Sequence, residues 1–259
     1  MNRTRQLYVE RKENHMSEVA ALSIIDERGV QKISLNRPDK ANALNDEMVD
    51  RLLGLVKEVY SRNIKVLILE GKGNHFCGGV DFSGYLDKSE GDLLLRFVKI
   101  EQILQLLRYA PFCTIARARG AAFGAGADLV TSCAYRIGTS SAKFRFPGFQ
   151  FGVALGTRHL TRLVGGKKAR EILLNNRQID SLEALECTLL THIIEDDDFE
   201  KEILHVVENV VKLSPRSVEK ILFNTTQDTR DQDMADLVHS VSVPGIHKRI
   251  KKYREMSMK

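Results

Sequence analysis

Two glycine-rich turns are the segments of this chain whose backbone could do chemistry. The first, HFCGGVDF, spans residues 75–82, and the second, GAAFGAGADL, spans residues 120–129. Each follows a strand-like apolar run and leads toward a helix, so each leaves backbone N–H groups without partners. Two such groups that converge form an oxyanion hole, which is worth roughly 2.7–4 kcal/mol per donor in a transition state. Glycine there lets a carbonyl group reach the backbone.

One glycine cluster alone is better explained as a tight turn, and other chemistries lack their signatures. A phosphate-binding loop needs GxxxxGK followed by Ser or Thr, or else GxGxxG, and GAAFGAG matches neither. No serine or cysteine nucleophile is paired with a base at a readable spacing. The cysteines have no metal-ligand spacing, so we expect no metal and a reducing compartment; they are Cys77, Cys113, Cys133 and Cys187.

Apolar periodicity places the two turns within an alternation of strands and helices. A hairpin is expected over residues 20–35, and a further buried strand over 65–71. Amphipathic helices are expected over 45–60, with Asn45 as N-cap, and over 90–107. The repeated order of strand, turn and helix predicts an α/β fold with right-handed crossovers.

The chain divides into three expected segments. Residues 1–17 are a polar leader, residues 18–195 form the core with the site, and residues 196–259 form a helical C-terminal region. No apolar run approaches the length of a membrane helix, and we expect a cytoplasmic protein. A net charge of +5 is mild, and the basic tail at 246–254 resembles the solvated face of a helix, so nucleic acid is not an expected partner.

The two turns belong to a set of four motifs that occur in a familiar order. The motifs are RPDKANALN (37–45), HFCGGVDF, RGAAFGAGADL (119–129) and KFRFPGFQFGVALGTRHLTRLVG (143–165). Their order and spacing resemble those of the crotonase, or enoyl-CoA hydratase/isomerase, superfamily. The resemblance implies a spiral of ββα units with a C-terminal helical oligomerisation region. It also implies homotrimers or hexamers that act in fatty acid metabolism on acyl-CoA, with coenzyme A as part of the substrate and no separate cofactor.

The resemblance assigns roles to single residues. The backbone N–H groups of Val80 and Ala125 are the implied oxyanion donors. Arg37 and Lys40 lie in the motif that borders the nucleotide end of coenzyme A, where cations would pair with phosphates. The remaining implied substrate-binding residues are Gly78, Gly79, Gly124, Gly126 and, as a weaker candidate on the loop beside the acyl pocket, Tyr85.

Two positions depart from the family pattern. Hydratases carry a glutamate where this chain has Asp128 and a second glutamate where it has Gly148. Hydration needs two carboxylates around one water, so we expect slow hydration by this chain. Asp128 is either an acid/base group or a cap in the first turn of a helix. Restoring both glutamates, by Asp128→Glu with Gly148→Glu, is expected to raise hydration more than about tenfold.

The sequence leaves several functions open. The leading hypothesis is a lyase or isomerase that stabilises a thioester enolate, borne by coenzyme A or by a carrier protein. The alternatives are a decarboxylase or hydrolase of the same superfamily, and a thioester-binding protein with little activity. No residue is an obvious replacement for the second glutamate; the nearby polar residues, which we interpret as structural or solvated, are Arg145, Gln150 and His159.

Overall fold

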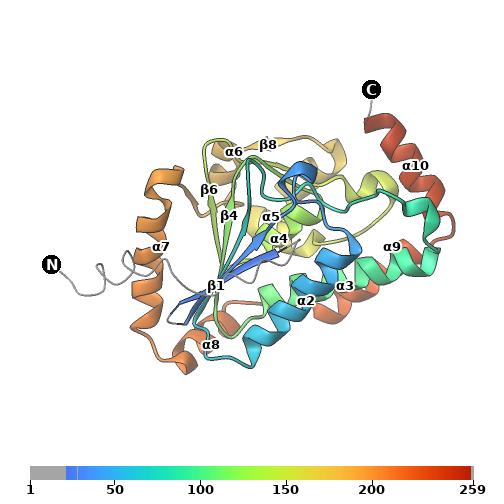
Figure 1. Ribbon diagram of the computed structural model, residues 1–259. Coiled ribbons are helices and arrows are strands. Elements are labelled where there is room, and N and C mark those ends of the chain that lie inside the picture. The colour runs from blue at the N-terminus through green and yellow to red at the C-terminus, as the bar shows by residue number, and fades with distance from the viewer. Residues whose placement is uncertain (1–21, 28, 258–259) are drawn as a thin grey trace.

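The computed structural model describes residues 22–27 and 29–257. The expected polar leader at 1–17 lies outside these described residues. The described chain forms a mixed α/β structure in which a central sheet is covered by helices on both faces (Figure 1).

The central sheet carries the strands that lead into the site. Its order is β1-β2-β3-β4-β6-β9. The first two strands pair antiparallel, which confirms the expected hairpin, and all later neighbours pair parallel. The strands are β1 (Leu22–Glu27), β2 (Val30–Leu35), β3 (Val66–Gly71), β4 (Cys113–Ala118), β6 (Tyr135–Gly138) and β9 (His192–Ile193).

A second, smaller sheet stands beside the first and was not expected from the sequence. It has the order β5-β7-β8, with β5 (Ala121–Phe123), β7 (Lys143–Arg145) and β8 (Ile179–Asp180). Strands of two or three residues are too short to show a period, so only their partners define them.

The helices of the core begin where local signals place them. Helix α2 (Asp46–Tyr60) begins after Asn45, whose side chain accepts a hydrogen bond from the Met48 backbone, which confirms the expected N-cap. Helix α3 (Glu90–Arg108) begins with a capping box formed by Ser89 and Asp92. The other core helices are α4 (Ala125–Thr131), α5 (Thr157–Asn175) and α6 (Ser181–Glu186), and the short turns are η1 (Pro38–Lys40), η2 (Tyr85–Asp87) and η3 (Pro147–Phe151).

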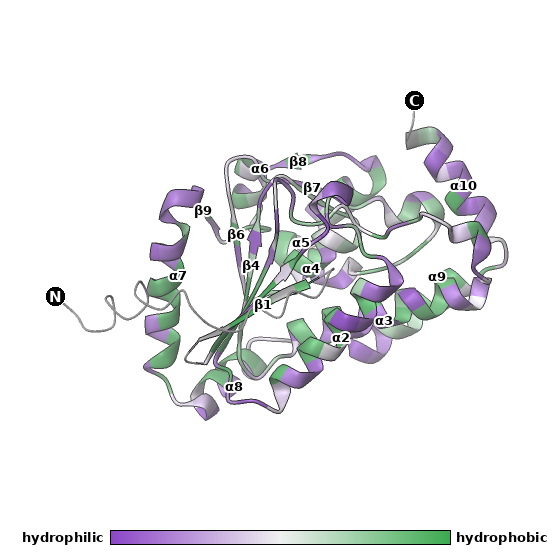
Figure 2. Cartoon of the chain, viewed as in Figure 1, coloured by the Kyte–Doolittle hydropathy of each residue, from purple (hydrophilic) through white to green (hydrophobic). Residues whose placement is uncertain are grey.

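The helices after residue 195 pack on the core. Helix α7 (Asp196–Val211) covers one face of the sheet with Phe199, Ile203 and Val206. Helix α9 (Arg230–Ser242) lies along α3, and α10 (Ile246–Ser257) lies beside η3 (Figure 1). Helix α8 (Pro215–Asn224) joins α7 to α9. Figure 2 shows the alternating polar and apolar stripes with which these helices meet the core and solvent.

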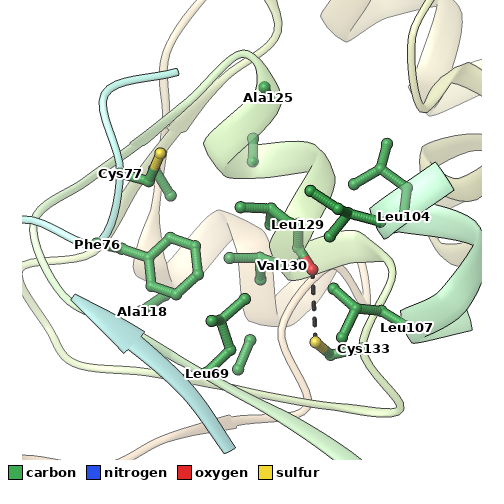
Figure 3. Close-up of a cluster of buried hydrophobic side chains, with 14 of the residues drawn as sticks. Leu69, Phe76, Cys77, Leu104, Leu107, Ala118, Ala125, Leu129, Val130 and Cys133 are labelled. Atoms are coloured by element: carbon green, nitrogen blue, oxygen red, sulfur yellow. Dashed lines mark hydrogen bonds between the residues drawn. The ribbon is translucent and has the colours of Figure 1, made fainter. Parts of the chain in front are cut away.

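The main core fills the other face of the sheet, beneath α2, α3 and α4. Figure 3 shows Leu104 and Leu107 of α3 facing Leu129 and Val130 of α4, with Phe76 on the opposite side of the two α4 residues. This packing sets where α4 begins, and therefore where its first backbone N–H groups lie.

Candidate active site

The two glycine-rich turns lie against each other. Cys77 donates its backbone N–H to the Ala121 carbonyl at 3.1 Å, and Phe123 donates to the Cys77 carbonyl at 2.9 Å. Figure 3 shows both segments, labelled at Cys77 and Ala125, over the same core. Backbone hydrogen bonds therefore hold the two turns together, although more than 40 residues separate them in the sequence.

Glycine is required in these turns because the two turns approach each other so closely. Gly79 has φ +97°, and a Cβ there would lie 2.7 Å from the Phe123 carbonyl oxygen. A Cβ at Gly126 would lie 2.2 Å from the Cys77 carbonyl oxygen. The sequence-based explanation, that glycine makes room for a ligand carbonyl, is thus incomplete, because glycine also lets the two turns touch.

Two backbone N–H groups at this contact have no partner within the described chain. Around Val80, Leu44 donates to the Gly79 carbonyl at 2.7 Å and Asp81 donates to the Leu44 carbonyl at 3.0 Å, which leaves the Val80 N–H unused. Ala125 is the first residue of α4, where the helix supplies no acceptor. These are the two donors that the sequence resemblance implied.

Val80 and Ala125 line a pocket of about 640 Å³, a volume that includes its open mouth. The wall is mainly apolar, and its aromatic side chains are Phe82, Phe97, Phe146, Phe149, Phe151 and Tyr253. Tyr253 comes from α10, so the C-terminal helix completes the pocket. The structure also brings Gly78, Gly79, Gly124, Asp128 and Gly148 to this wall, whereas Gly126 lies behind it.

Asp128 is the one carboxyl group that lines the pocket among the described residues. It is 4% exposed, and its Oδ1 atom has no hydrogen-bond partner within the described chain. A Cβ at Gly156 would lie 2.2 Å from that oxygen, so the carboxyl group fills the space that a glycine leaves. Asp128 lies in the first turn of α4, and no side chain makes a capping hydrogen bond to this helix.

The environment of Asp128 favours its protonated form. Burial raises the pKa of Asp128 well above its usual range, and the nearby carboxyl group of Glu101 raises it further. A carboxyl group in this state donates a hydrogen bond or a proton at neutral pH.

The backbone explains the missing side chain at Gly148. A Cβ there would lie 2.8 Å from the Val153 carbonyl oxygen, while Val153 donates its own N–H to the Gly148 carbonyl at 2.9 Å. A larger residue at position 148 would have to displace this backbone segment.

The two cations expected to bind phosphates have different environments. Arg37 donates to Asp81 Oδ2 at 3.0 and 3.1 Å and to the Ala43 carbonyl at 2.6 Å, so its guanidinium ties the first motif to the first glycine turn. Lys40 is exposed at the end of η1. A phosphate contact therefore stays a prediction for both residues, with Lys40 the more available cation.

The other polar candidates lie off the pocket wall. Tyr85 is 4% exposed and stacks on His247 of α10 at 6.2 Å between ring centroids. Arg145 donates to Asn176, Gln150 is exposed, and His159 is buried beside Ser132. Glu101 was missed; its place among Phe97, Ile100 and Leu104 on one apolar helix face was the signal that could have found it.

A comparison of the chain with protein families decides its membership. The model of the enoyl-CoA hydratase/isomerase family matches residues 26–252. The chain belongs to this family. The family match and the mixed α/β architecture confirm the resemblance and the fold class expected from the four motifs.

Individual members of the enoyl-CoA hydratase/isomerase family resemble this chain over different lengths. A candidate enoyl-CoA hydratase/isomerase of Bacillus subtilis is 35% identical over 62% of this chain and 64% of its own length. Mouse ethylmalonyl-CoA decarboxylase is 30% identical over 66% of this chain and 55% of its own length. The matches thus span less than two thirds of these relatives. A solved candidate enoyl-CoA hydratase/isomerase of Bordetella parapertussis has a TM-score of 0.89 at 35% identity, covering 91% of this chain and 98% of that one.

Two further chemical features bear on this family member. Across residues 22–27 and 29–257, His, Cys, Asp and Glu side chains do not gather in groups of three or more that could hold a metal. Within the same part of the chain, the helices are too short or too polar to cross a membrane.

Proposed function

We propose that the protein acts on an acyl-CoA thioester, whose carbonyl oxygen accepts hydrogen bonds from the Val80 and Ala125 N–H groups as negative charge develops on it. The observation that carries this proposal is the pair of unpartnered backbone donors at one apolar pocket. Each such donor contributes about 3 kcal/mol when the enolate forms, because the pocket excludes water and the groups are already oriented.

The chemistry at the α-carbon is the transfer of one proton by Asp128. Hydration needs a second carboxyl group to hold and deprotonate water, and Asp128 alone lines the described pocket. The ionised form of Asp128 removes a proton from the α-carbon, and the electrons of that C–H bond move onto the thioester oxygen to form the enolate. The protonated Asp128 then returns a proton to carbon, and the carbonyl double bond re-forms as the negative charge leaves the oxygen. The proposed reaction class is therefore proton transfer through an enolate, as in an isomerase, rather than hydration.

Decarboxylation is the second candidate function. Loss of carbon dioxide from a 2-carboxyacyl thioester leaves an enolate, which then needs only an oxyanion hole and one proton. The buried, protonated state of Asp128 favours this reaction, since no base is required. The similarity to mouse ethylmalonyl-CoA decarboxylase supports it in part, over about half of that relative's length.

The acyl group is apolar on this proposal. Aromatic and aliphatic side chains line most of the described wall, and no lysine or arginine lines it, so a charged acyl terminus would lack a partner. The nucleotide end of coenzyme A lies toward the motif that carries Lys40, although the thioester could also be borne by a carrier protein.

Assembly into trimers or hexamers remains part of the proposal. Helix α8 leaves Ile221 52% exposed and Phe223 75% exposed, and the core of the same chain does not cover them. Apolar side chains exposed together on one helix are typical of a surface that meets another subunit.

The test measures proton exchange at the α-carbon. Straight-chain acyl-CoA thioesters incubated in D2O should gain deuterium at that carbon, as followed by NMR. Asp128→Asn should slow this at least about 100-fold, while acyl-CoA still raises the melting temperature.

A pair of variants at Ala125 tests the role of its backbone N–H group. Ala125→Pro removes one N–H at the first position of a helix, where proline is tolerated, and Ala125→Ser keeps that N–H as the matched control. We expect a loss of about 100-fold or more in the first and little change in the second. Thermal stabilisation by acyl-CoA without exchange or decarboxylation would support the low-activity binding protein instead. No stabilisation by any acyl-CoA would overturn the proposal.

A further inference from the structure

A buried polar cluster lies behind the pocket, and the proposed reaction does not use most of it. It is formed where α3, α4, α5 and α9 meet. Its members are Glu101 (1% exposed), Asp128 (4%), Ser132 (1%), His159 (1%) and Asp233 (9%). Only Asp128 among them reaches the pocket wall.

Glu101 lies on helix α3, between the pocket and the helix that carries Asp128. Phe97, one turn earlier on the same face, lines the pocket. Leu104, three residues after Glu101, packs against Leu129 of α4 (Figure 3). Glu101 therefore lies between a pocket residue and the helix that carries Asp128, and both carboxyl groups are out of solvent.

We propose that Glu101 is a positioning residue that shares the burial of negative charge with Asp128, so that one charge at most resides on the pair and Asp128 faces the substrate as a neutral acid. The electrostatic pairing stands on its own geometry, and its catalytic consequence rests on the proposed function. Two carboxyl groups in one dry cluster cannot both ionise without a large cost unless a cation joins them.

Two of the three arginines near the cluster bind other groups. Arg158 of α5 donates to Asp233 at 3.0 Å and pairs with Asp236 at 2.7 Å. Arg162 of α5 donates to Thr229 at 3.0 Å. Arg108, on the last turn of α3, has no hydrogen-bond partner for its Nε within the described chain, and its charge acts on Asp233 and His159. Among the described residues, no lysine or arginine forms an ion pair with Glu101 or Asp128.

The neutral groups around Glu101 complete its surroundings. Gln105 of the same helix donates to Glu101 Oε1 at 2.9 Å and to the Arg230 carbonyl at 3.0 Å, which links the cluster to α9. Asp233 of α9 accepts from Thr229 Oγ1 at 2.6 Å. Glu101 thus has two carboxyl neighbours, Asp128 and Asp233, and one amide donor.

His159 does not supply the proton. Burial lowers its pKa to about 4, so it is neutral at physiological pH. Ser132 donates its hydroxyl hydrogen to the Asp128 carbonyl, so His159 Nδ1, at 2.9 Å from Ser132 Oγ, must donate to it. His159 Nε2 then carries no hydrogen, which fits its lack of a bonded partner 3.7 Å from Asp233.

The order of ionisation follows from these contacts. Burial raises the pKa of Glu101 to about 7; the Gln105 hydrogen bond opposes this rise and Asp233 adds to it. Burial also raises the pKa of Asp128 well above its usual range, and the charge on Glu101 raises it further. Asp128 therefore keeps its proton while Glu101 is ionised.

Infrared titration of the carboxyl groups tests the pairing without substrate. The carboxylic-acid C=O band of Asp128 is identified by its loss in Asp128→Asn. In Glu101→Gln, which keeps the Gln105 contact but cannot ionise, this band should disappear about one pH unit or more lower than in the wild type. Glu70→Gln, another buried glutamate outside the cluster, is the matched control and should leave the Asp128 band unchanged.

The wild-type protein gives a second measurement in case Glu101→Gln does not fold. Its cluster should lose two protons in separate steps, with Asp128 losing its proton last. An Asp128 band that disappears in the ordinary carboxyl range, or at the same pH with and without Glu101, would overturn the inference. A shifted band in a protein with no activity on any thioester would instead leave the pair intact and contradict the proposed function. In an active protein, the pH limb of α-carbon exchange should move to lower pH in Glu101→Gln.

Discussion

At the scale of single residues, position 148 shows how the backbone restricts what a site can carry. Gly148 lines the pocket, and a Cβ added to it would face the Val153 carbonyl oxygen. The expectation that Gly148→Glu with Asp128→Glu would restore hydration does not take this contact into account, and Asp128 already fills the space beside Gly156.

We predict that Gly148→Ala lowers the free energy of unfolding by about 1–3 kcal/mol, because the new Cβ must displace backbone rather than a flexible side chain. Urea unfolding measures this. Gly54→Ala in α2, where nothing lies within 4 Å of the added Cβ, is the matched control and should stabilise the protein by about 0.5–1 kcal/mol. The double glutamate variant should hydrate crotonyl-CoA less than about tenfold faster than wild type; a larger gain would show that the 148 segment adapts.

At the scale of elements, helix α10 depends on one arginine for its place over the pocket. Arg249 donates through Nη1 to the carbonyls of Phe151 and Gly152 at 3.0 Å and of Ser240 at 3.2 Å. Through Nη2 it donates to those of Val241 and Val243 at 3.1 and 2.8 Å. The side chain thereby joins α10, η3 and the end of α9.

Replacing this side chain should loosen α10 before it unfolds the core. We predict that Arg249→Met costs about 2 kcal/mol locally, because five carbonyls lose a charged donor. Amide exchange in α10 should accelerate while exchange in α2 stays slow, and KM for acyl-CoA should rise because Tyr253 leaves the wall. Lys251→Met, an exposed lysine on the same helix, should change neither measurement. Equal acceleration in α2 and α10 would mean that Arg249 supports the whole fold instead.

At the scale of the whole molecule, buried carboxyl groups should give stability an unusual dependence on pH. Glu101 has a folded-state pKa of about 7, above its ordinary value of 4.5. The stability that the buried Glu101 contributes in its neutral form is therefore fully present below about pH 4.5. It is lost as the pH rises through about 7. The carboxyl groups whose pKa is lowered act at more acidic pH: they contribute stability above about pH 4 and lose it on acidification, and they include Asp46, Asp81 and Asp196.

We predict that the free energy of unfolding falls by an amount on the order of 3 kcal/mol between pH 5 and pH 8, since about 2.5 pKa units separate the two states of Glu101. Denaturant unfolding at the two pH values measures it. Glu101→Gln should remove part of this slope, and buried Asp128, whose pKa is also raised, should supply the rest, whereas Glu70→Gln should retain the whole slope. A wild-type protein that is equally stable at both pH values would contradict the buried state of Glu101.

Local sequence predicted the long elements and the positions of the two glycine turns, and the family resemblance named Val80 and Ala125 as the proposed backbone donors. The hairpin, helix α2 with its Asn45 cap and the two glycine turns follow from periods, caps and glycine positions within short windows. The same windows could not reveal β5, β7 and β8, because strands this short exist only through their partners. Nor could they decide between a cap and a chemical role for Asp128.

The tertiary structure decided what surrounds Asp128. Its burial, its contact with Gly156 and the carboxyl group of Glu101 come from α3, α4 and α5, which are distant along the chain. The tertiary contact with Asp81 likewise showed that Arg37, expected from its motif to face a phosphate, is engaged within the protein. Backbone donors depend on local conformation, which nearby residues specify. The ionisation of a side chain depends on solvent and charge in three dimensions, and only the folded chain brings those groups together.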